Sequence, residues 1–329
     1  MDGPGPKNAI TDVPGLKVGN AEDADVKTGV TVLLPDAPAI VAGDVRGGGP
    51  GTRETDLLDP ATLVDRADAI VLSGGSSYGL AAADGVTNWL GARGRGFQLI
   101  ARDGIPPSPI VPAAILYDLA NGGNKKWGDT PPYTRLGKNA CDAASLEISQ
   151  GSVGAGTGAL AGNGIGGLGS ASFITHDGLT VGAIAAVNSF GSTKMPGNAP
   201  RAFWAWPFEL NNEFGGLRPP SEMVGVTDLP DDTKLAPART NTTITAIAIS
   251  SPCSQASLRR IAIMAQDGLA RAIRPVHAPT DGDVVFALST ADKASEPDPI
   301  TLTRLGNIAA DCLARAIARG VYEAEKASR

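Results

Sequence analysis

One junction in the chain combines a hydroxyl, an amide and a strand in a way that suits nucleophilic chemistry. In ARTNTTITAIAIS (238–250), polar residues run directly into an alternating apolar segment. If the peptide bond after Asn241 were broken, Thr242 would carry a free α-amine beside its own hydroxyl, so that one residue supplied both nucleophile and base. An α-amine has an ordinary pKa of about 7.7–8.0, which suits a general base at neutral pH. The alternative is an ordinary threonine-rich edge strand, which the pattern alone would favour.

Other familiar catalytic arrangements are missing from the sequence. The chain has two histidines and three widely separated cysteines, with neither metal-ligand spacing nor a Cys–His pair. It also has no GxSxG elbow and no Walker loop. His277, just after Pro275, could act as a base, but a surface or structural role is the expectation. The chemistry must therefore come from hydroxyls, amides, carboxylates or an amine, and we expect no metal and no cofactor.

The elements that would position these groups can be read from apolar patterns. Short, partly β-branched segments predict strands at 39–45, 69–75, 179–189, 242–250 and 283–290. Apolar spacings near three and four predict helices at 78–90, 254–275 and 302–323, the second closed by Pro275. Cys312 falls on the apolar face of the last helix, so we expect it in the core.

Two kinds of segment interrupt these elements. Glycines gather in RGGGPG (46–51), SGGSSYG (73–79) and the tract 151–169, which predicts tight turns packed around a site or simply loops between strands. The stretch 190–239 is rich in proline and aromatic residues with little periodicity, and we expect a long loop that ends in an exposed linker, LPDDTKLAPARTN (229–241). An exposed segment that runs into a strand can be cut without loss of the fold.

Composition narrows the class of protein. The 329 residues include 42% hydrophobic and 19% charged residues, which is typical of a globular protein with a substantial core. The net charge of -6, with scattered Lys and Arg, argues against nucleic acid as a partner, and no apolar run is long enough for a membrane span. The opening MDGPGPKNAI lacks the pattern of a signal segment, and the odd cysteine number fits a reducing compartment. We therefore expect a cytoplasmic location.

The junction at Asn241–Thr242 resembles the cleavage site of a known family. NTTITAIAI (241–249) is similar to that site in the self-processing, N-terminal-nucleophile aminopeptidases, which include D-/L-aminopeptidases, β-peptidyl aminopeptidases and the nylon-oligomer (6-aminohexanoate) endo-hydrolase. The resemblance extends along nearly the whole chain in the family's order. Its further blocks are ITDVPGLKVGNAED (10–23), TGVTVLLP (28–35), DVRGGGPGTRETDLL (44–58), VLSGGSSYGLAAADGV (71–86), VGAGTGA (153–159), GGLGSAS (166–172), AAVNSFG (185–191) and GLARAIRPVHAPTDGDVVFALST (268–290).

The resemblance implies a role for each matching residue. Thr242 is the expected nucleophile, Asn188 matches the asparagine whose amide holds the oxyanion, and Tyr78 matches a tyrosine that lines the site. Asp281 and Asp283 match the acidic pair beside the nucleophile, where two carboxylates on a strand edge would face one side and anchor the new ammonium or move its proton. For TDGD itself, a tight turn is the alternative.

The resemblance also implies a four-layer α/β/β/α sandwich of the D-/L-aminopeptidase and ornithine-acetyltransferase type, as a single domain. Self-cleavage would divide it into a large chain, 1–241, and a small chain, 242–329. The expected activity is hydrolysis of a small peptide or oligoamide, in a homo-oligomer, commonly a tetramer. At one position the sequence departs from the nylon-hydrolase type, because Asn163 stands where a lysine is expected after the glycine tract.

Two other functions compete with amide hydrolysis. Ornithine acetyltransferases share the implied fold and self-cleave before a threonine, but they pass the acyl group to an amine and not to water. A binding protein without catalysis is the second alternative, with SGGSSYG (73–79) cradling a phosphate before a helix. The first competitor predicts dependence on ornithine, whereas the second predicts an intact chain that a nucleotide stabilises.

Overall fold

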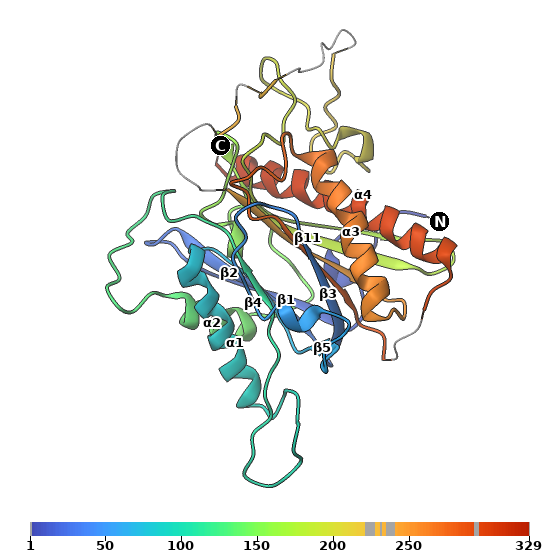
Figure 1. Ribbon diagram of the computed structural model, residues 1–329. Coiled ribbons are helices and arrows are strands. Elements are labelled where there is room, and N and C mark those ends of the chain that lie inside the picture. The colour runs from blue at the N-terminus through green and yellow to red at the C-terminus, as the bar shows by residue number, and fades with distance from the viewer. Residues whose placement is uncertain (1, 221–227, 231, 235–240, 293–295, 329) are drawn as a thin grey trace.

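Two stacked sheets between two pairs of helices form the body of the protein (Figure 1). The computed structural model describes residues 2–220, 228–230, 232–234, 241–292 and 296–328. The expected four-layer α/β/β/α sandwich is confirmed. Within the described residues, no helix has the length and apolar character that a membrane crossing requires.

The larger sheet has six strands and carries the predicted junction. Its order is β10 (Gly167–Ile174), β11 (Thr180–Asn188), β12 (Thr242–Ile249), β13 (Val284–Ser289), β3 (Ala39–Val45) and β5 (Arg66–Ala67). Only the pair β12 and β13 is parallel among these neighbours. The apolar runs of these strands suit a sheet that is covered on both faces. The strands predicted at 39–45, 69–75, 179–189, 242–250 and 283–290 are all confirmed, within two residues at each end.

The smaller sheet has five strands and packs against the first. Its order is β1 (Leu16–Asp23), β2 (Thr28–Pro35), β6 (Ile70–Ser73), β7 (Ala113–Ile115) and β4 (Thr52–Arg53). A separate two-stranded ribbon joins β8 (Leu160–Ala161) to β9 (Gly164–Ile165). Short 3-10 helices connect the strands at η1 (Ile10–Asp12), η2 (Asp56–Leu58), η3 (Ser76–Ala81), η4 (Gly154–Gly156) and η5 (Trp206–Phe208).

Each sheet is covered by one helix pair. The six-stranded sheet is covered by α3 (Gln255–Ala272) and α4 (Pro299–Ala327), and the five-stranded sheet by α1 (Ala82–Gly91) and α2 (Tyr133–Asp142). Ser254 caps α3 by accepting a hydrogen bond from the Ser257 amide, and Asp298 caps α4. The predicted helix at 78–90 begins as the 3-10 turn η3, α3 ends three residues before Pro275, and α4 is longer than expected at both ends.

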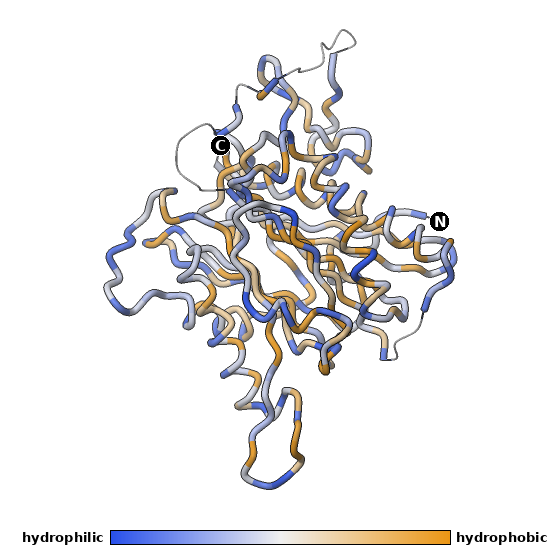
Figure 2. Tube along the Cα trace, viewed as in Figure 1, coloured by the Kyte–Doolittle hydropathy of each residue, from blue (hydrophilic) through white to orange (hydrophobic). Residues whose placement is uncertain are grey.

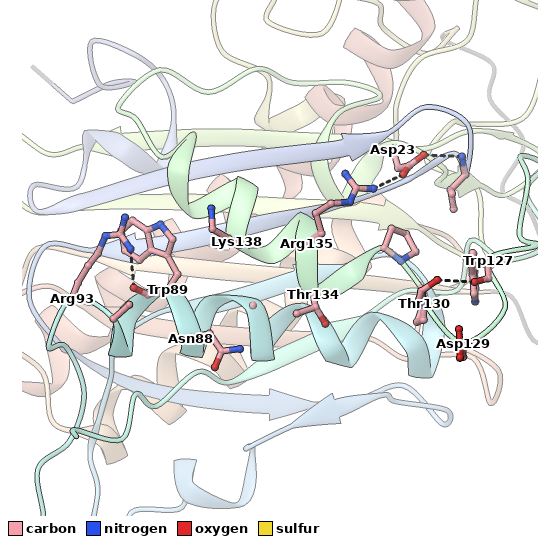
Figure 3. Close-up of a pocket in the computed structure, with 15 residues that line it drawn as sticks. Asp23, Asn88, Trp89, Arg93, Trp127, Asp129, Thr130, Thr134, Arg135 and Lys138 are labelled. Atoms are coloured by element: carbon pink, nitrogen blue, oxygen red, sulfur yellow. Dashed lines mark hydrogen bonds and ion pairs between the residues drawn. The ribbon is translucent and has the colours of Figure 1, made fainter. Parts of the chain in front are cut away.

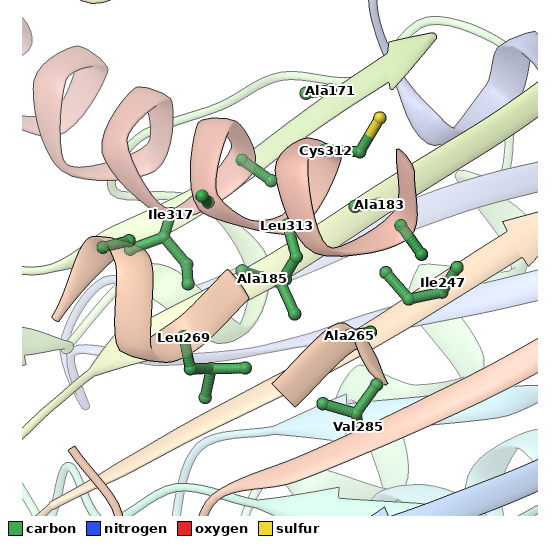
Figure 4. Packing of buried hydrophobic residues seen from close by; sticks show 14 of the residues in the cluster. Ala171, Ala183, Ala185, Ile247, Ala265, Leu269, Val285, Cys312, Leu313 and Ile317 are labelled. Carbon is green, nitrogen blue, oxygen red and sulfur yellow. The ribbon is translucent and has the colours of Figure 1, made fainter. Parts of the chain in front are cut away.

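Three hydrophobic cores lie between the four layers. Hydrophobic residues recur along the strands and helices (Figure 2), and Figure 4 shows part of the core beneath α3 and α4. Along β12, Ile244 and Ala246 face the five-stranded sheet, whereas Ile247 packs beneath α3 and α4. This alternation follows from the two-residue period of a strand. Thr242 shares the parity of Ile244, so its side chain lies on the face between the two sheets. Cys312 lies on the buried face of α4, as predicted.

The proline-rich stretch after β11 is only partly the exposed loop that the sequence predicted. Phe203 and Phe214 are buried, with ring centroids 5.5 Å apart, and they belong to the core beneath α3 and α4. In the predicted linker 229–241, Thr233 and Lys234 are also buried, so the expectation of exposure was wrong there. Residues 231 and 235–240 of that linker lie outside the described part of the chain.

Candidate active site

Thr242 opens β12 at the edge of the space between the sheets. It is 3% exposed, and its hydroxyl donates a hydrogen bond to the carbonyl oxygen of Asn241. Asn241 is buried as well, and its side-chain amide donates to Thr280 Oγ1 over 3.3 Å. The hydroxyl of Thr242 therefore lies beside the carbonyl group of the peptide bond that the sequence marks for cleavage.

Asn188 ends β11 directly opposite Thr242 in the antiparallel register. Directly opposed residues of an antiparallel pair project to the same face of a sheet. The Asn188 Oδ1 atom accepts hydrogen bonds from the Leu160 amide over 2.9 Å and from Asn121 Nδ2 over 3.4 Å, and its Nδ2 atom donates to the Tyr117 carbonyl over 3.0 Å. These contacts fix the plane of the amide group. Leu160 binds its oxygen, and its nitrogen points away from Leu160.

Asp281 and Asp283 reach the site because β13 runs parallel to β12. Asp283 Oδ1 accepts from the Thr243 amide over 2.8 Å, and its Oδ2 atom accepts from the His277 amide over 3.1 Å and contacts His277 Nδ1 at 2.8 Å. Asp281 accepts from the amides of Ala278, over 2.9 Å, and Phe190, over 3.2 Å. The expected position on a strand edge was wrong, because both carboxylates lie in the turn before β13 and bind backbone amides.

Burial changes the protonation of Asp281. Both carboxyl groups are 1% exposed. Burial, followed by repulsion from Asp283, raises the pKa of Asp281 to about 7, although the amides of Ala278 and Phe190 and the charge of His277 oppose the shift. Asp281 therefore titrates near neutral pH.

Two glycine segments leave room for Thr242. A Cβ atom on Gly282 would stand 2.7 Å from Thr242 Oγ1 and 2.9 Å from the Gly49 carbonyl oxygen. The RGGGPG loop binds the same turn, since the Gly49 amide donates to the Asp281 carbonyl over 2.7 Å and the Arg46 amide donates to the Asp283 carbonyl over 3.0 Å. RGGGPG therefore packs against the turn that carries Asp281 and Asp283.

Sequence reasoning missed one buried cation. Lys234 is 8% exposed, and its Nζ atom donates to the Leu160 carbonyl over 2.9 Å. Burial lowers its pKa to about 8, while the charge of Asp281 opposes that shift. No pattern marks Lys234, because a single lysine in a proline-rich segment is typical of a solvated loop. Asn163, noted for standing where a lysine was expected, contacts the carbonyls of Asp232 and Thr233 just before it.

Tyr78 differs from the other predicted site residues because it is exposed. It belongs to η3, is 49% exposed and packs edge-on against Trp127, with ring centroids 5.5 Å apart. Trp127 also lines a cavity of about 950 Å³ over α1 and α2, whose wall includes Trp89 and Arg135 (Figure 3). Thr242 is not among the residues that line this cavity. In the described part of the chain, no cluster of three or more His, Cys, Asp or Glu side chains could hold a metal ion.

Comparison with known proteins places this chain in a family. The profile of peptidase family S58 matches residues 8–329. This chain belongs to peptidase family S58. It is 44% identical to an uncharacterized aminopeptidase of Mycobacterium tuberculosis over 97% of its own length and 94% of that protein. It is 29% identical to the 6-aminohexanoate-oligomer endohydrolase of a Kocuria species, over 92% of its length and 82% of the relative. Family S58 membership makes the chain an amide-bond hydrolase and removes the binding-protein alternative.

Solved structures support the same fold. A β-aminopeptidase from a Burkholderia species superposes with a TM-score of 0.70 at 23% identity, covering 97% of this chain and 88% of the other. The L-aminopeptidase D-Ala-esterase/amidase of Ochrobactrum anthropi, described as a variant of the Ntn hydrolase fold, gives a TM-score of 0.70 at 19% identity, with 97% and 87% coverage. At these identities the likeness establishes the fold alone.

Proposed function

We propose that the chain matures by cutting itself between Asn241 and Thr242, and that Thr242 is then the nucleophile for amide hydrolysis. The observation that carries this proposal is the contact between the Thr242 hydroxyl and the Asn241 carbonyl oxygen, with Asn188 opposite in register. Proximity of this kind makes the attack intramolecular, which removes much of its entropic barrier.

The maturation step is an acyl shift from nitrogen to oxygen. Thr242 Oγ1 attacks the Asn241 carbonyl carbon, the C–N bond to Thr242 breaks, and the nitrogen takes up the proton that the hydroxyl gives up. Water then hydrolyses the ester, which leaves a carboxylate on Asn241 and an amine on Thr242. The two products stay together because β12 pairs with β11 and β13 pairs with β3, so the small chain supplies the middle of the six-stranded sheet.

Turnover reuses the same groups. The α-amine of Thr242 accepts the hydroxyl proton, the oxygen attacks a substrate amide, and the Asn188 amide donates to the tetrahedral oxyanion. Tyr78, on the open side, is the proposed second donor or substrate contact. Asp281 and Asp283 hold the turn beside the new amine, where their charge favours the ammonium when it forms.

The proposed substrates are small peptides or peptide-like amides. The 44% identity to an uncharacterized aminopeptidase favours peptides with a free amino end, and the 29% identity to a 6-aminohexanoate-oligomer endohydrolase adds oligoamides as a second class to be assayed. The resemblance also supports a homo-oligomer, a tetramer in its commonest form, in the cytoplasm. Light scattering and cell fractionation would test those two points.

A matched pair of substitutions tests the nucleophile. Thr242→Val removes the proposed nucleophilic hydroxyl, whereas Thr243→Val removes the neighbouring buried hydroxyl, which has no hydrogen-bond partner in the described structure. Hydrolysis of amino-acid p-nitroanilides and of 6-aminohexanoate oligomers is then measured with and without ornithine. We expect activity in the wild type and Thr243→Val, and none in Thr242→Val. An active Thr242→Val protein would exclude the residue, and activity that requires ornithine would indicate acyl transfer.

A further inference from the structure

Lys234 is joined to the proposed oxyanion group through a single residue. Its Nζ atom donates to the Leu160 carbonyl over 2.9 Å, and the amide of the same Leu160 donates to Asn188 Oδ1 over 2.9 Å. A buried ammonium is costly unless other groups compensate its charge. Only 8% of Lys234 is exposed, so its buried charge requires compensating groups near the site.

The backbone around Lys234 is tied to the acidic turn as well. The Lys234 amide donates to the Phe190 carbonyl over 3.0 Å, and the Phe190 amide donates to Asp281 Oδ1 over 3.2 Å. On the other side, the Asn163 amide donates to the Asp232 carbonyl over 2.8 Å. The backbone of Lys234 is therefore bonded directly to Phe190, the residue whose amide binds Asp281.

Charge links the same groups. Lys234 and Asp281 attract each other, and Asp281 also faces Asp283 and His277 in its own turn. On the adjoining elements the ionisable groups are Asp232, paired with Arg201 at 2.7 Å, and Arg46, paired with Asp44 at 2.6 Å. The new amine of Thr242 would join them after cleavage. Lys234 therefore adds a buried positive charge to a group that already contains two buried carboxylates.

We infer that Lys234 is a positioning residue of the catalytic site, whose ammonium holds the Leu160 loop against Asn188 and attracts the Asp281 carboxylate. An ionised Asp281 accepts both the Ala278 and the Phe190 amides, and Phe190 lies two residues beyond Asn188. Loss of the cation would favour the protonated carboxyl group, which accepts these two amide hydrogen bonds more weakly than the carboxylate does. The inference rests on the proposed function and adds a role that the sequence did not indicate.

The effect on pH dependence follows from the sign of the charge. A nearby cation lowers the pKa of a carboxyl group, so its removal raises the pKa of Asp281. The acidic limb of the rate profile should then move to higher pH in Lys234→Met. Lys234 itself loses its proton above about pH 8, so the wild type and Lys234→Met should converge at high pH. Lys234→Arg keeps the charge and should restore the acidic limb.

The experiment compares Lys234→Met, Lys234→Arg and the control Lys194→Met. Lys194 is a part-buried lysine paired with Glu325 at 2.6 Å, outside the set of residues around Thr242. Turnover of an amino-acid p-nitroanilide is measured from pH 5 to 9, and maturation is followed by mass. We expect the midpoint of the acidic limb to rise by about one pH unit in Lys234→Met, so that the rate below the midpoint is roughly tenfold lower than in the wild type. We expect no shift of this midpoint in Lys194→Met.

Each outcome decides between the alternatives. A Lys234→Met protein whose acidic midpoint equals that of the wild type overturns the inference, as does failure of Lys234→Arg to restore it. If Lys234→Met folds but stays uncut, cleavage of Lys234→Arg supports the inference and an uncut Lys234→Arg contradicts it. If Lys234→Met does not fold, Lys234→Gln replaces it under the same criteria. An uncut or inactive wild type would instead defeat the proposed function itself.

Discussion

The two sides of the candidate site differ in how firmly they are held. On the nucleophile side, Thr242, Asn188, Asp281 and Asp283 are each at most 3% exposed and bound into the six-stranded sheet or its turns. On the tyrosine side, Tyr78 is half exposed and rests on Trp127. Groups that stabilise a transition state work best when they are fixed in advance. We therefore expect the buried side to carry the chemistry and the open side to adapt to the substrate.

Removal of the Asn188 amide should have the largest effect among residues other than Thr242. Asn188→Ala deletes the proposed donor to the oxyanion, and we expect kcat to fall by about 10²–10³. Single-turnover and steady-state assays on an amide substrate would measure the loss. The control is Asn20→Ala, which removes an asparagine of β1 that accepts from Thr31 over 2.8 Å. If kcat fell as far in Asn20→Ala as in Asn188→Ala, the effect would not be specific to the proposed oxyanion donor.

Crowding of the nucleophile tests how tightly that side is built. Gly282→Ala would place a methyl group 2.7 Å from Thr242 Oγ1, and the Gly49 backbone behind it cannot yield cheaply. A displacement near 1 Å costs about 10² in rate, so we expect cleavage of the chain to slow by that factor. In the control, Gly91→Ala, the added carbon meets Pro109 Cγ at an ordinary 3.8 Å. Normal maturation of Gly282→Ala, followed by mass, would show that the pocket around Thr242 is loose.

Asp281 should make the nucleophile side less stable as pH rises. Its pKa is about 7 in the folded protein and 3.8 when unperturbed, so the folded state holds the proton more tightly and the free energy of unfolding falls from about pH 4 to pH 7. The full cost above pH 7 is on the order of 4 kcal/mol at most. Asp281→Asn carries no such charge, so its melting temperature should gain on the wild type as pH rises, while activity falls. A difference in melting temperature that is constant from pH 4 to pH 8 would contradict this.

The smallest effect is expected on the open side. Tyr78→Phe removes one exposed hydroxyl, and a single neutral hydrogen bond contributes about 1 kcal/mol, so KM should change about fivefold or less. Self-cleavage should proceed at the wild-type rate, because Tyr78 is half exposed and packs on Trp127. Mass analysis and steady-state kinetics on two amide substrates would measure both. If Tyr78→Phe failed to cleave itself, the tyrosine would take part in maturation like the buried residues.

The sequence predicted the strands of the nucleophile side but not how they meet. The β-branched runs at 242–250 and 283–290 marked two strands, yet no local pattern specifies that β12 and β13 are parallel neighbours. That pairing is what brings Asp281 and Asp283 to Thr243 and His277. Both carboxylates bind backbone amides just before the strand, and this binding depends on tertiary contacts. The sequence therefore misplaced them on the strand edge.

Lys234 illustrates the other limit of sequence reasoning. A proline-rich, polar segment is usually solvated, and that expectation held for Leu229, which is 46% exposed, but failed five residues later. The burial of Lys234 arises from contacts with Phe190 and Leu160, more than forty residues distant in the chain. Asn188 and Thr242, by contrast, could be chosen in advance because a family resemblance named both, and the register places them face to face.

The intact mass of the purified wild-type protein under denaturing conditions tests the central claim most directly. The account predicts two species, corresponding to residues 1–241 and 242–329, with the new amino terminus at Thr242. A single uncut species of 33.3 kDa that persists on incubation would contradict self-cleavage and the role of Thr242 as an amino-terminal nucleophile.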